Sequence, residues 1–226
     1  MSAPLPPLAM LGGTFDPVHF GHLRAAADVR AALGLPCVEL VPSADPPHRP
    51  PPGANAADRV AMLERAIADF PGLRIDLREI ARGGKSYTAD TLRDMRAQWP
   101  TRSLAWIVGS DAFLGLPTWH RHHDILELAH LVVIARPGLD LRARLAGELA
   151  AQWSSRATVD AGALLRNPAG AIVIVTTTPH AVSATAIRAA LARSPRDRAA
   201  LLQLLPAAVL AYIESHHLYG VAADAR

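Results

Sequence analysis

The chain has 226 residues, a formal net charge of +3 and a single cysteine, Cys37. This length predicts one sizeable core, so we expect a single domain over residues 1–226, with its core at about 8–219. Hydrophobic residues make up 50% of the chain, which excludes a disordered protein. The lone cysteine excludes an internal disulfide framework and a cysteine-based zinc site, and it fits a reducing, cytoplasmic compartment.

The charge pattern supports neither a nucleic-acid partner nor a membrane partner. No block of Lys or Arg stands out along the sequence. Met1–Pro7 has no basic region followed by an apolar stretch, so it does not resemble a signal peptide. No apolar run approaches the roughly 18 residues that span a bilayer. We therefore expect a soluble, cytoplasmic protein.

Short apolar runs alternate with helical patterns along the chain. The predicted strands are Leu8–Leu11, Cys37–Val41, Leu73–Ile80, Leu104–Val108, Leu131–Ala135 and Ala171–Thr176. The predicted helices are His22–Leu33, Ala56–Phe70, Thr88–Trp99, Ile125–Ala129, about Leu141–Trp153, Ala184–Ala192 and Pro206–His216. This alternation predicts an α/β fold, namely a doubly wound, mostly parallel Rossmann-like sheet with helices on both faces. The proline-rich stretch Pro42–Gly53 predicts a loop.

A glycine-containing run follows the first predicted strand and leads into the first predicted helix. Gly12 and Gly13 let the backbone come close to a ligand, and His19 and His22 bracket the helix start. Backbone N–H groups at a helix N-terminus favour anions, so this run suits the phosphates of a nucleotide. Neither the Walker sequence nor Gly-x-Gly-x-x-Gly occurs, which argues against a P-loop NTPase and an ordinary NAD-dependent dehydrogenase.

The two histidines of this run admit four interpretations. As a metal pair, His19 and His22 lack an evident third ligand, and as a structural pair they are solvated or packed in the core. General-base catalysis is weakly supported, because a phosphate nucleophile is already ionised at pH 7. Binding and neutralising phosphate charge is favoured, because nucleotidyl transfer depends on positioning and electrostatic stabilisation.

Two further turns are expected at the same edge of the sheet. In a doubly wound sheet the first and fourth strands flank the point where the strand order reverses, and ligands bind there. The fourth predicted strand ends in Gly109-Ser110-Asp111. Ser183 follows the last predicted strand as a helix N-cap, and Arg188 on the second turn is a fork-shaped donor that suits phosphate. We expect all three turns to face one crevice.

The motif Thr14-Phe15-Asp16-Pro17-x-His19-x-Gly21-His22, with Ser183-x-Thr185-x-x-Arg188, resembles the nucleotidyltransferase superfamily marked by His-x-Gly-His and Ser-x-Thr-x-x-Arg. Within that superfamily the chain is most similar to the bacterial nicotinate-nucleotide adenylyltransferases. The closer similarity rests on Pro46–Arg49, Ser86–Leu92, Gly109–Phe113 with Trp119, Ala135–Gly138 and Tyr212–Tyr219. It covers about Leu8–Tyr219.

The resemblance implies transfer of the adenylyl group of ATP to nicotinate mononucleotide, giving deamido-NAD and pyrophosphate in NAD biosynthesis. It implies Mg²⁺ carried with ATP, without metal ligands from protein side chains. The implied catalytic residues are His19, His22 and Arg188. The implied ATP-binding residues are Gly12, Gly13, Thr14, Phe15, His19, His22, Gly109, Asp111, Ser183 and Arg188. The implied nicotinate-nucleotide-binding residues are Asp16, Tyr87, Thr88, Trp119 and His120, the last through its backbone.

Several of these residues also have structural interpretations. Trp119 fits a core position, Thr88 fits a helix N-cap, and Asp16 before Pro17 fits a turn former. The run His120–His123 looks like a set of metal ligands, but we interpret it as a solvated face. Ala184 stands where many relatives have a second serine, which removes one hydroxyl from the predicted phosphate site.

Three other functions stay open at this stage. The same chemistry on nicotinamide mononucleotide or on 4′-phosphopantetheine is one kind of alternative, and a non-catalytic nucleotide-binding regulator is another. The phosphopantetheine branch shares the first and last motifs but lacks the pairing of Ser-Tyr-Thr with Asp-x-Phe…Trp. Intact His19, His22 and Arg188 argue against a regulator. The sequence leaves homo-oligomer formation open.

Overall fold

The computed structural model describes residues 5–47, 50–135, 138, 140–178, 182–193 and 196–221. Its strands form one seven-stranded sheet in the order β3-β2-β1-β4-β5-β7-β6. They are β1 (Leu8–Gly13), β2 (Val38–Pro42), β3 (Leu73–Ile75), β4 (Leu104–Gly109), β5 (His130–Ala135), β6 (Ala157–Thr158) and β7 (Ile172–Thr176). Every neighbouring pair is parallel, which confirms the predicted Rossmann-like α/β fold.

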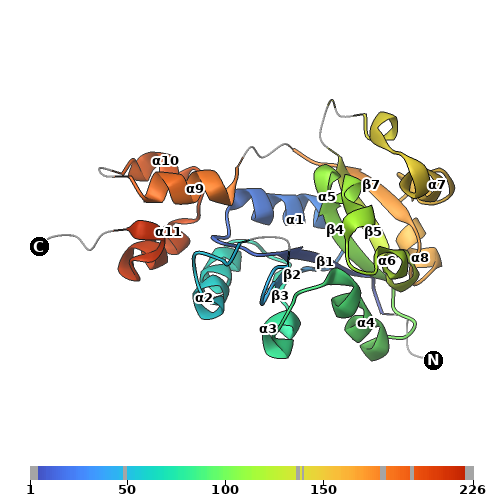
Figure 1. Cartoon of the computed structure of the whole chain (residues 1–226), viewed down its shortest axis with the longest axis horizontal. Helices are drawn as coiled ribbons and strands as arrows, with labels where there is room; N and C mark the ends of the chain where they lie inside the picture. Colours follow the sequence, from blue (N-terminus) through green and yellow to red (C-terminus); the bar gives the residue numbers. More distant parts are fainter. Residues whose placement is uncertain are drawn as a thin grey trace, which may run out of the picture.

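The helices lie on both faces and at both ends of this sheet (Figure 1). They are α1 (Phe20–Ala32), α2 (Ala56–Ile67), α3 (Arg78–Arg82), α4 (Thr88–Gln98), α5 (Ser110–Leu114), α6 (His122–Leu128), α7 (Gly147–Arg156), α8 (Ala163–Arg166), α9 (Ala184–Leu191), α10 (Arg198–Leu202) and α11 (Ala207–Ser215). Short 3₁₀ helices occupy Leu116–Thr118, Arg142–Arg144 and Leu218–Gly220. Figure 1 shows α9, α10 and α11 gathered at one end of the molecule, with α7 and α8 at the other end. No helix of the described ranges is long and apolar enough to cross a membrane.

The core has two halves because side chains alternate across a strand. In β1, Ala9 belongs to the half that packs against α1, α2 and α9 to α11. Leu8 and Met10, its neighbours along the strand, belong to the half that packs against α4, α5 and α6. All three residues are at most 1% exposed, so β1 is buried on both faces and lies at the centre of the fold.

The strand order reverses at β1 and β4, which are hydrogen-bonded neighbours as predicted. Ala9 pairs with Ala105, and Leu11 pairs with Ile107. Because the pair is parallel, the glycines that end the two strands, Gly13 and Gly109, lie at the same edge of the sheet. This edge is where an open α/β sheet binds its ligand.

The predicted strand Leu73–Ile80 is wrong in its second half. Strand β3 ends at Ile75, and the Asp76 carboxylate accepts a hydrogen bond of 2.9 Å from the Arg78 backbone N–H. An aspartate that bonds the backbone two residues ahead favours a turn over a continuing strand. The apolar run therefore changes direction, and helix α3 follows it.

The predicted helix at about Leu141–Trp153 consists of two pieces. A 3₁₀ turn at Arg142–Arg144 is separated from α7 by an extended backbone at Leu145 and Ala146, and Gly147 has a positive φ of 54°. A glycine in that conformation interrupts a helix readily. Beyond α7, Ala157–Thr158 forms the edge strand β6, which is too short to show a periodic pattern in the sequence.

The first prediction concerns the contact between Gly12 and Trp106 across β1 and β4. A Cβ atom at position 12 would lie 2.3 Å from Trp106 Cζ2, and this tryptophan is only 4% exposed. We expect Gly12→Ala to lower the free energy of unfolding by about 1–3 kcal/mol, measured by urea denaturation, because the core has to be overpacked.

Gly109→Ala is the matched control at the end of the neighbouring strand. A Cβ atom there has no other atom within 4 Å, so we expect a change within about 0.5 kcal/mol. Equal losses for the two variants would contradict the steric explanation.

Candidate functional site

The two histidines of the opening motif stack on each other at the start of α1. The ring centroids of His19 and His22 are 3.7 Å apart, with an interplanar angle of 18°. A Cβ atom at Gly21 would lie 3.0 Å from the His19 ring, so a larger residue would crowd that ring where it lies over the first turn. The His22 and Phe15 rings meet in a T-shaped contact at a centroid distance of 5.0 Å. The spacing His-x-Gly-His thus follows from close packing of the imidazoles.

His19 is buried and uncharged. It is 5% exposed, and desolvation lowers its pKa from 6.5 to about 4, although its own backbone favours the protonated form. Its Nδ1 atom is buried and has no hydrogen-bond partner among the residues that the structure describes. An anion placed beside this ring would raise the pKa, because a nearby negative charge favours the imidazolium.

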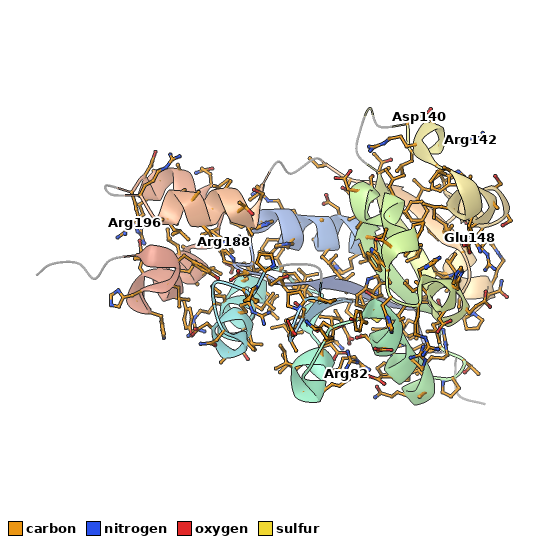
Figure 2. The ribbon with its side chains drawn as sticks, in the orientation of Figure 1. Arg82, Asp140, Arg142, Glu148, Arg188 and Arg196 are labelled. Carbon is orange, nitrogen blue, oxygen red and sulfur yellow. The ribbon has the colours of Figure 1, made fainter. Side chains whose placement is uncertain are left out.

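Arg188 connects the closing motif to the opening one. Its Nη1 atom donates a 2.6 Å hydrogen bond to the Asp16 backbone carbonyl and lies 3.6 Å from the Asp16 carboxylate. The side chain is 34% exposed, so the guanidinium remains accessible to a ligand. Figure 2 shows Arg188 on the side of α9 where α2 and α11 lie. Ser183 caps α9 as predicted, since its side chain accepts a 3.2 Å hydrogen bond from the Ala186 N–H.

The Asp16 side chain has a full set of protein partners. Its two carboxylate oxygens accept hydrogen bonds from the backbone N–H groups of Gly53 (2.8 Å) and Ala54 (3.0 Å). The Tyr219 hydroxyl donates a third bond of 2.8 Å, and Asp16 is only 6% exposed. Burial raises the pKa of Tyr219, and the Asp16 carboxylate raises it further, so the hydroxyl keeps its proton. These contacts favour the structural interpretation of Asp16.

Arg59 is a part of the site that the sequence analysis did not single out. It is 1% exposed, and it donates to the backbone carbonyls of Thr14 (2.8 Å) and Ala44 (3.4 Å). Burial lowers the pKa of the guanidinium, whereas Asp16 and Tyr219 raise it. A signal was present, because Arg59 occupies the same buried stripe of α2 as Met62 and Leu63. An arginine on an apolar stripe indicates a buried, partnered cation.

The second predicted turn lies at the end of β4. Gly109 is exposed and precedes α5, and Asp111 lies exposed in the first turn of that helix. Ser110 is buried, and its hydroxyl donates a 2.8 Å hydrogen bond to the Ile134 carbonyl at the end of β5. This bond holds the turn against the neighbouring strand while leaving Gly109 and Asp111 accessible.

The structure also brings together residues predicted to bind the nicotinate nucleotide. The Tyr87 and His120 rings lie 4.2 Å apart between centroids, although 33 positions separate them in the sequence. Trp119 is half-buried against the core, which gives the core interpretation partial support. Thr88 is the first residue of α4 and not its N-cap; Tyr87 holds the N-cap position, with no side-chain cap.

Backbone contacts tie this group to the proline-rich loop. The Ser86 hydroxyl accepts from the Ala44 N–H at 2.9 Å, and the Ser86 N–H donates to the Asp45 carbonyl at 2.9 Å. The Ala44 carbonyl also accepts a hydrogen bond from Arg59. A continuous chain of contacts therefore joins the Tyr87 segment to the opening motif. The parts of the family resemblance at His48–Arg49 and Arg136–Pro137 lie outside the described residues.

The class of protein follows from the match to a known family. A family model described as cytidylyltransferase-like matches residues 10–190. This range holds both the paired histidines and Ser183–Arg188, the two motifs that the fold places side by side. The chain belongs to this cytidylyltransferase-like family of nucleotidyltransferases.

Sequence relatives identify a narrower family within this class. The chain is 46% identical over 215 residues to the "Probable nicotinate-nucleotide adenylyltransferase" of Pseudomonas entomophila (strain L48), covering 94% of each chain. It is 46% identical over 214 residues to the protein of the same name from Stenotrophomonas maltophilia (strain K279a), covering 92% of this chain and 94% of the relative. Within its class, the chain belongs to the nicotinate-nucleotide adenylyltransferases.

A solved structure supports the fold. The nicotinic acid mononucleotide adenylyltransferase of Plasmodium falciparum, complexed with NaAD, superimposes with a TM-score of 0.72. The alignment covers 96% of this chain and 99% of that chain, at 14% sequence identity. The two proteins thus share an architecture, although few of their aligned residues are identical.

The second prediction concerns the pH dependence of stability through His19. The pKa is 6.5 for an unperturbed histidine and about 4 in the fold, so between these values the unfolded chain binds more protons. Stability therefore falls as the pH falls, and we expect His19 to account for a loss of about 2 kcal/mol between pH 7 and pH 5. Urea unfolding of the wild type and of His19→Gln at both pH values measures this loss in the free energy of unfolding. The loss should be smaller by that amount in the variant; identical losses would mean that His19 is not buried in its neutral form.

Proposed function

We propose that this protein transfers the adenylyl group of ATP to nicotinate mononucleotide, giving deamido-NAD and pyrophosphate. The observation that carries the proposal is the hydrogen bond from Arg188 to the Asp16 carbonyl, three residues before His19. It brings cationic and imidazole groups from two distant motifs to one edge of the sheet. The 46% identity to relatives named for this activity supports the same reaction.

The proposed chemistry needs stabilisation of charge more than proton transfer. An oxygen of the acceptor 5′-phosphate attacks the α-phosphorus of ATP and forms a P–O bond. The bond from that phosphorus to the leaving oxygen breaks, and pyrophosphate departs. Because the acceptor phosphate is ionised at pH 7, no side chain has to remove a proton. His19, His22 and Arg188 act as donors to the negative charge that shifts toward the leaving group.

The ATP side of the proposed site consists of the opening motif, the β4 turn and the start of α9. The backbone from Gly12 to Phe15 approaches the nucleotide, and Phe15 has a positive φ of 51°, a conformation that few non-glycine residues adopt. Arg59 and Asp16 hold this backbone and act as positioning residues. Gly109 and Asp111 meet the ribose, and Ser183 presents the N-terminus of α9 to the triphosphate.

The acceptor side of the proposed site consists of Tyr87, Thr88, Trp119 and His120. The contact between the Tyr87 and His120 rings supports this grouping. An aromatic plane against the nicotinate ring contributes about 0.5–1.5 kcal/mol beyond the buried area. Backbone N–H groups around His120 suit the ring carboxylate, and they disfavour an amide, since one of its groups would be mismatched.

We expect Mg²⁺ to enter with ATP, held by oxygens of the triphosphate. The charged and polar groups of the opening motif and the start of α9 fit an anion, because they are imidazoles, a guanidinium and backbone N–H groups. The nearby Asp16 carboxylate already accepts three hydrogen bonds from the protein. A hard cation prefers carboxylate and phosphate oxygens. When bound, the ion shields the phosphate charges and orients the leaving group.

A pyrophosphate-release assay tests the function and its alternatives. The purified protein is given ATP and Mg²⁺ with nicotinate mononucleotide, nicotinamide mononucleotide or 4′-phosphopantetheine as acceptor. We expect the highest kcat/KM with nicotinate mononucleotide. A higher kcat/KM for another acceptor would identify that acceptor as the substrate. Release of no pyrophosphate with any acceptor would favour a nucleotide-binding regulator.

The third prediction addresses charge stabilisation by His22. We expect His22→Ala to lower kcat by about 10²–10³, the usual loss for one donor to a developing charge. Steady-state kinetics measure the rate, and circular dichroism checks that the variant is folded. His216→Ala, at the exposed end of α11, is the control and should keep the wild-type rate. Near-full turnover in the His22 variant would exclude the proposed role.

The fourth prediction separates ligand binding from scaffolding at Trp119. We expect Trp119→Ala to raise the KM for nicotinate mononucleotide by at least about two- to tenfold, from the loss of ring stacking. The KM for ATP should change far less. Initial rates with each substrate varied in turn measure both constants, and equal changes in the two would mean that Trp119 only supports the fold.

A further inference from the structure

Three metal-ligating side chains meet at the end of the molecule formed by α6 and α7. His123 Nδ1 lies 3.0 Å from Glu148 Oε1, and His122 Nε2 lies 3.6 Å from Glu148 Oε2. One ligand atom from each residue lies within 4.8 Å of the other two. Over the ranges that the structure describes, this is the one group of three His, Cys, Asp or Glu side chains with such spacing.

Apolar packing brings these residues together across 25 positions of sequence. His122 and His123 begin α6, and Glu148 lies in the first turn of α7. Leu126 of α6 and Leu149 of α7 are each 5% exposed in the same half of the core. The cluster lines a small pocket whose other walls are Leu116, Pro117, Leu126, Leu149 and Gln152. The ligand atoms therefore project from two elements that the core already holds.

The spacing is close to that of a tetrahedral metal site. Zinc bonds of about 2.0–2.2 Å to nitrogen and oxygen place neighbouring ligand atoms about 3.3–3.6 Å apart. His122 Nε2 lies 3.6 Å from Oε2 of Glu148, at the upper end of that range, and His123 Nδ1 lies 3.0 Å from the other oxygen, Oε1, just below it. We propose that His122, His123 and Glu148 bind a divalent transition-metal ion of the zinc type, with a fourth position left to water.

The surroundings suit this class of ion. Two imidazoles and one carboxylate favour zinc and its first-row neighbours over Mg²⁺, which prefers all-oxygen ligands. The nearby cations are neutralised, because Arg121 pairs with Asp124 and Arg93 pairs with both Asp90 and Asp124. His123 and Glu148 have side chains that are 65% and 46% exposed, so an ion reaches them from solvent.

The ion would join α7 to α6 at a distance from the proposed phosphate-binding residues. Figure 2 shows Glu148 and Arg188 well apart, toward opposite ends of the sheet. Helix α6 begins two residues after His120, so the metal would stiffen the chain beside the proposed acceptor-binding residues. That last consequence rests on the proposed function, whereas metal binding itself does not.

The test uses the full chain, untagged and freed of metal by a chelator, with no nucleotide present. Calorimetric titration with Zn²⁺ is expected to give one saturable site, and Co²⁺ is expected to give the visible absorption of a low-coordinate ion. At about 100 times its Kd, Zn²⁺ should raise Tm by roughly 5–10 °C. A large excess of Mg²⁺ should not displace it.

Two variants assign the ligands. Glu148→Gln keeps the size of the side chain but is a poor ligand, and His123→Gln removes one imidazole; each should weaken Zn²⁺ binding at least about tenfold. His216→Ala removes an exposed histidine elsewhere and should bind Zn²⁺ like the wild type. Circular dichroism checks that each variant is folded, and using two ligand positions keeps the test valid if one variant misfolds.

No saturable Zn²⁺ binding by the wild type would overturn the proposal, as would wild-type affinity in the folded Glu148→Gln variant. Because no substrate is used, this result is independent of the pyrophosphate assay. Failure of the metal site leaves the proposed reaction standing, and failure of the reaction leaves the metal site standing.

Discussion

The buried carboxylate of Asp16 is the contact on which the arrangement of the site depends. It accepts hydrogen bonds from the backbone of Gly53 and Ala54 and from the hydroxyl of Tyr219, 203 residues away, and it faces Arg188. A buried charge is stable only when its partners are present, and losing one commonly costs about 3–5 kcal/mol. The opening motif, the proline-rich loop and the chain after α11 are therefore constrained together, and the sheet edge at Gly13 and Gly109 keeps one geometry.

The groups at this edge of the sheet favour an anion over a cation. Arg59 lies beneath the turn, where it holds the Thr14 carbonyl. Arg188 is partly exposed, and His19 is desolvated and neutral, with a pKa of about 4. Without a ligand this environment disfavours further positive charge, whereas a triphosphate would favour protonation of the imidazole. These are the electrostatic and positional features on which the proposed nucleotidyl transfer depends.

The reversal of strand order between β1 and β4 lies between the two regions of the proposed site. The opening motif after β1 and the start of α9 provide the groups suited to phosphates. The segment after β4 contributes Trp119 and His120, which meet Tyr87 at the start of α4. Helices α6 and α7 extend this second region outward, where His122, His123 and Glu148 converge. In the proposed function this sheet edge aligns two mononucleotides, and the proposed metal site lies at its periphery.

Local patterns in the sequence determined most of the fold and identified the residues of the proposed site. Strand and helix periodicity predicted the parallel sheet and the adjacency of β1 and β4, and the paired motifs predicted that His19 and Arg188 belong to one edge. Tertiary structure alone decided the partners of Asp16 and the approach of Glu148 to His123. Periodicity and capping depend on residues a few positions apart, whereas these contacts join residues 25 to 203 positions apart that only the packing of the core brings within hydrogen-bonding distance.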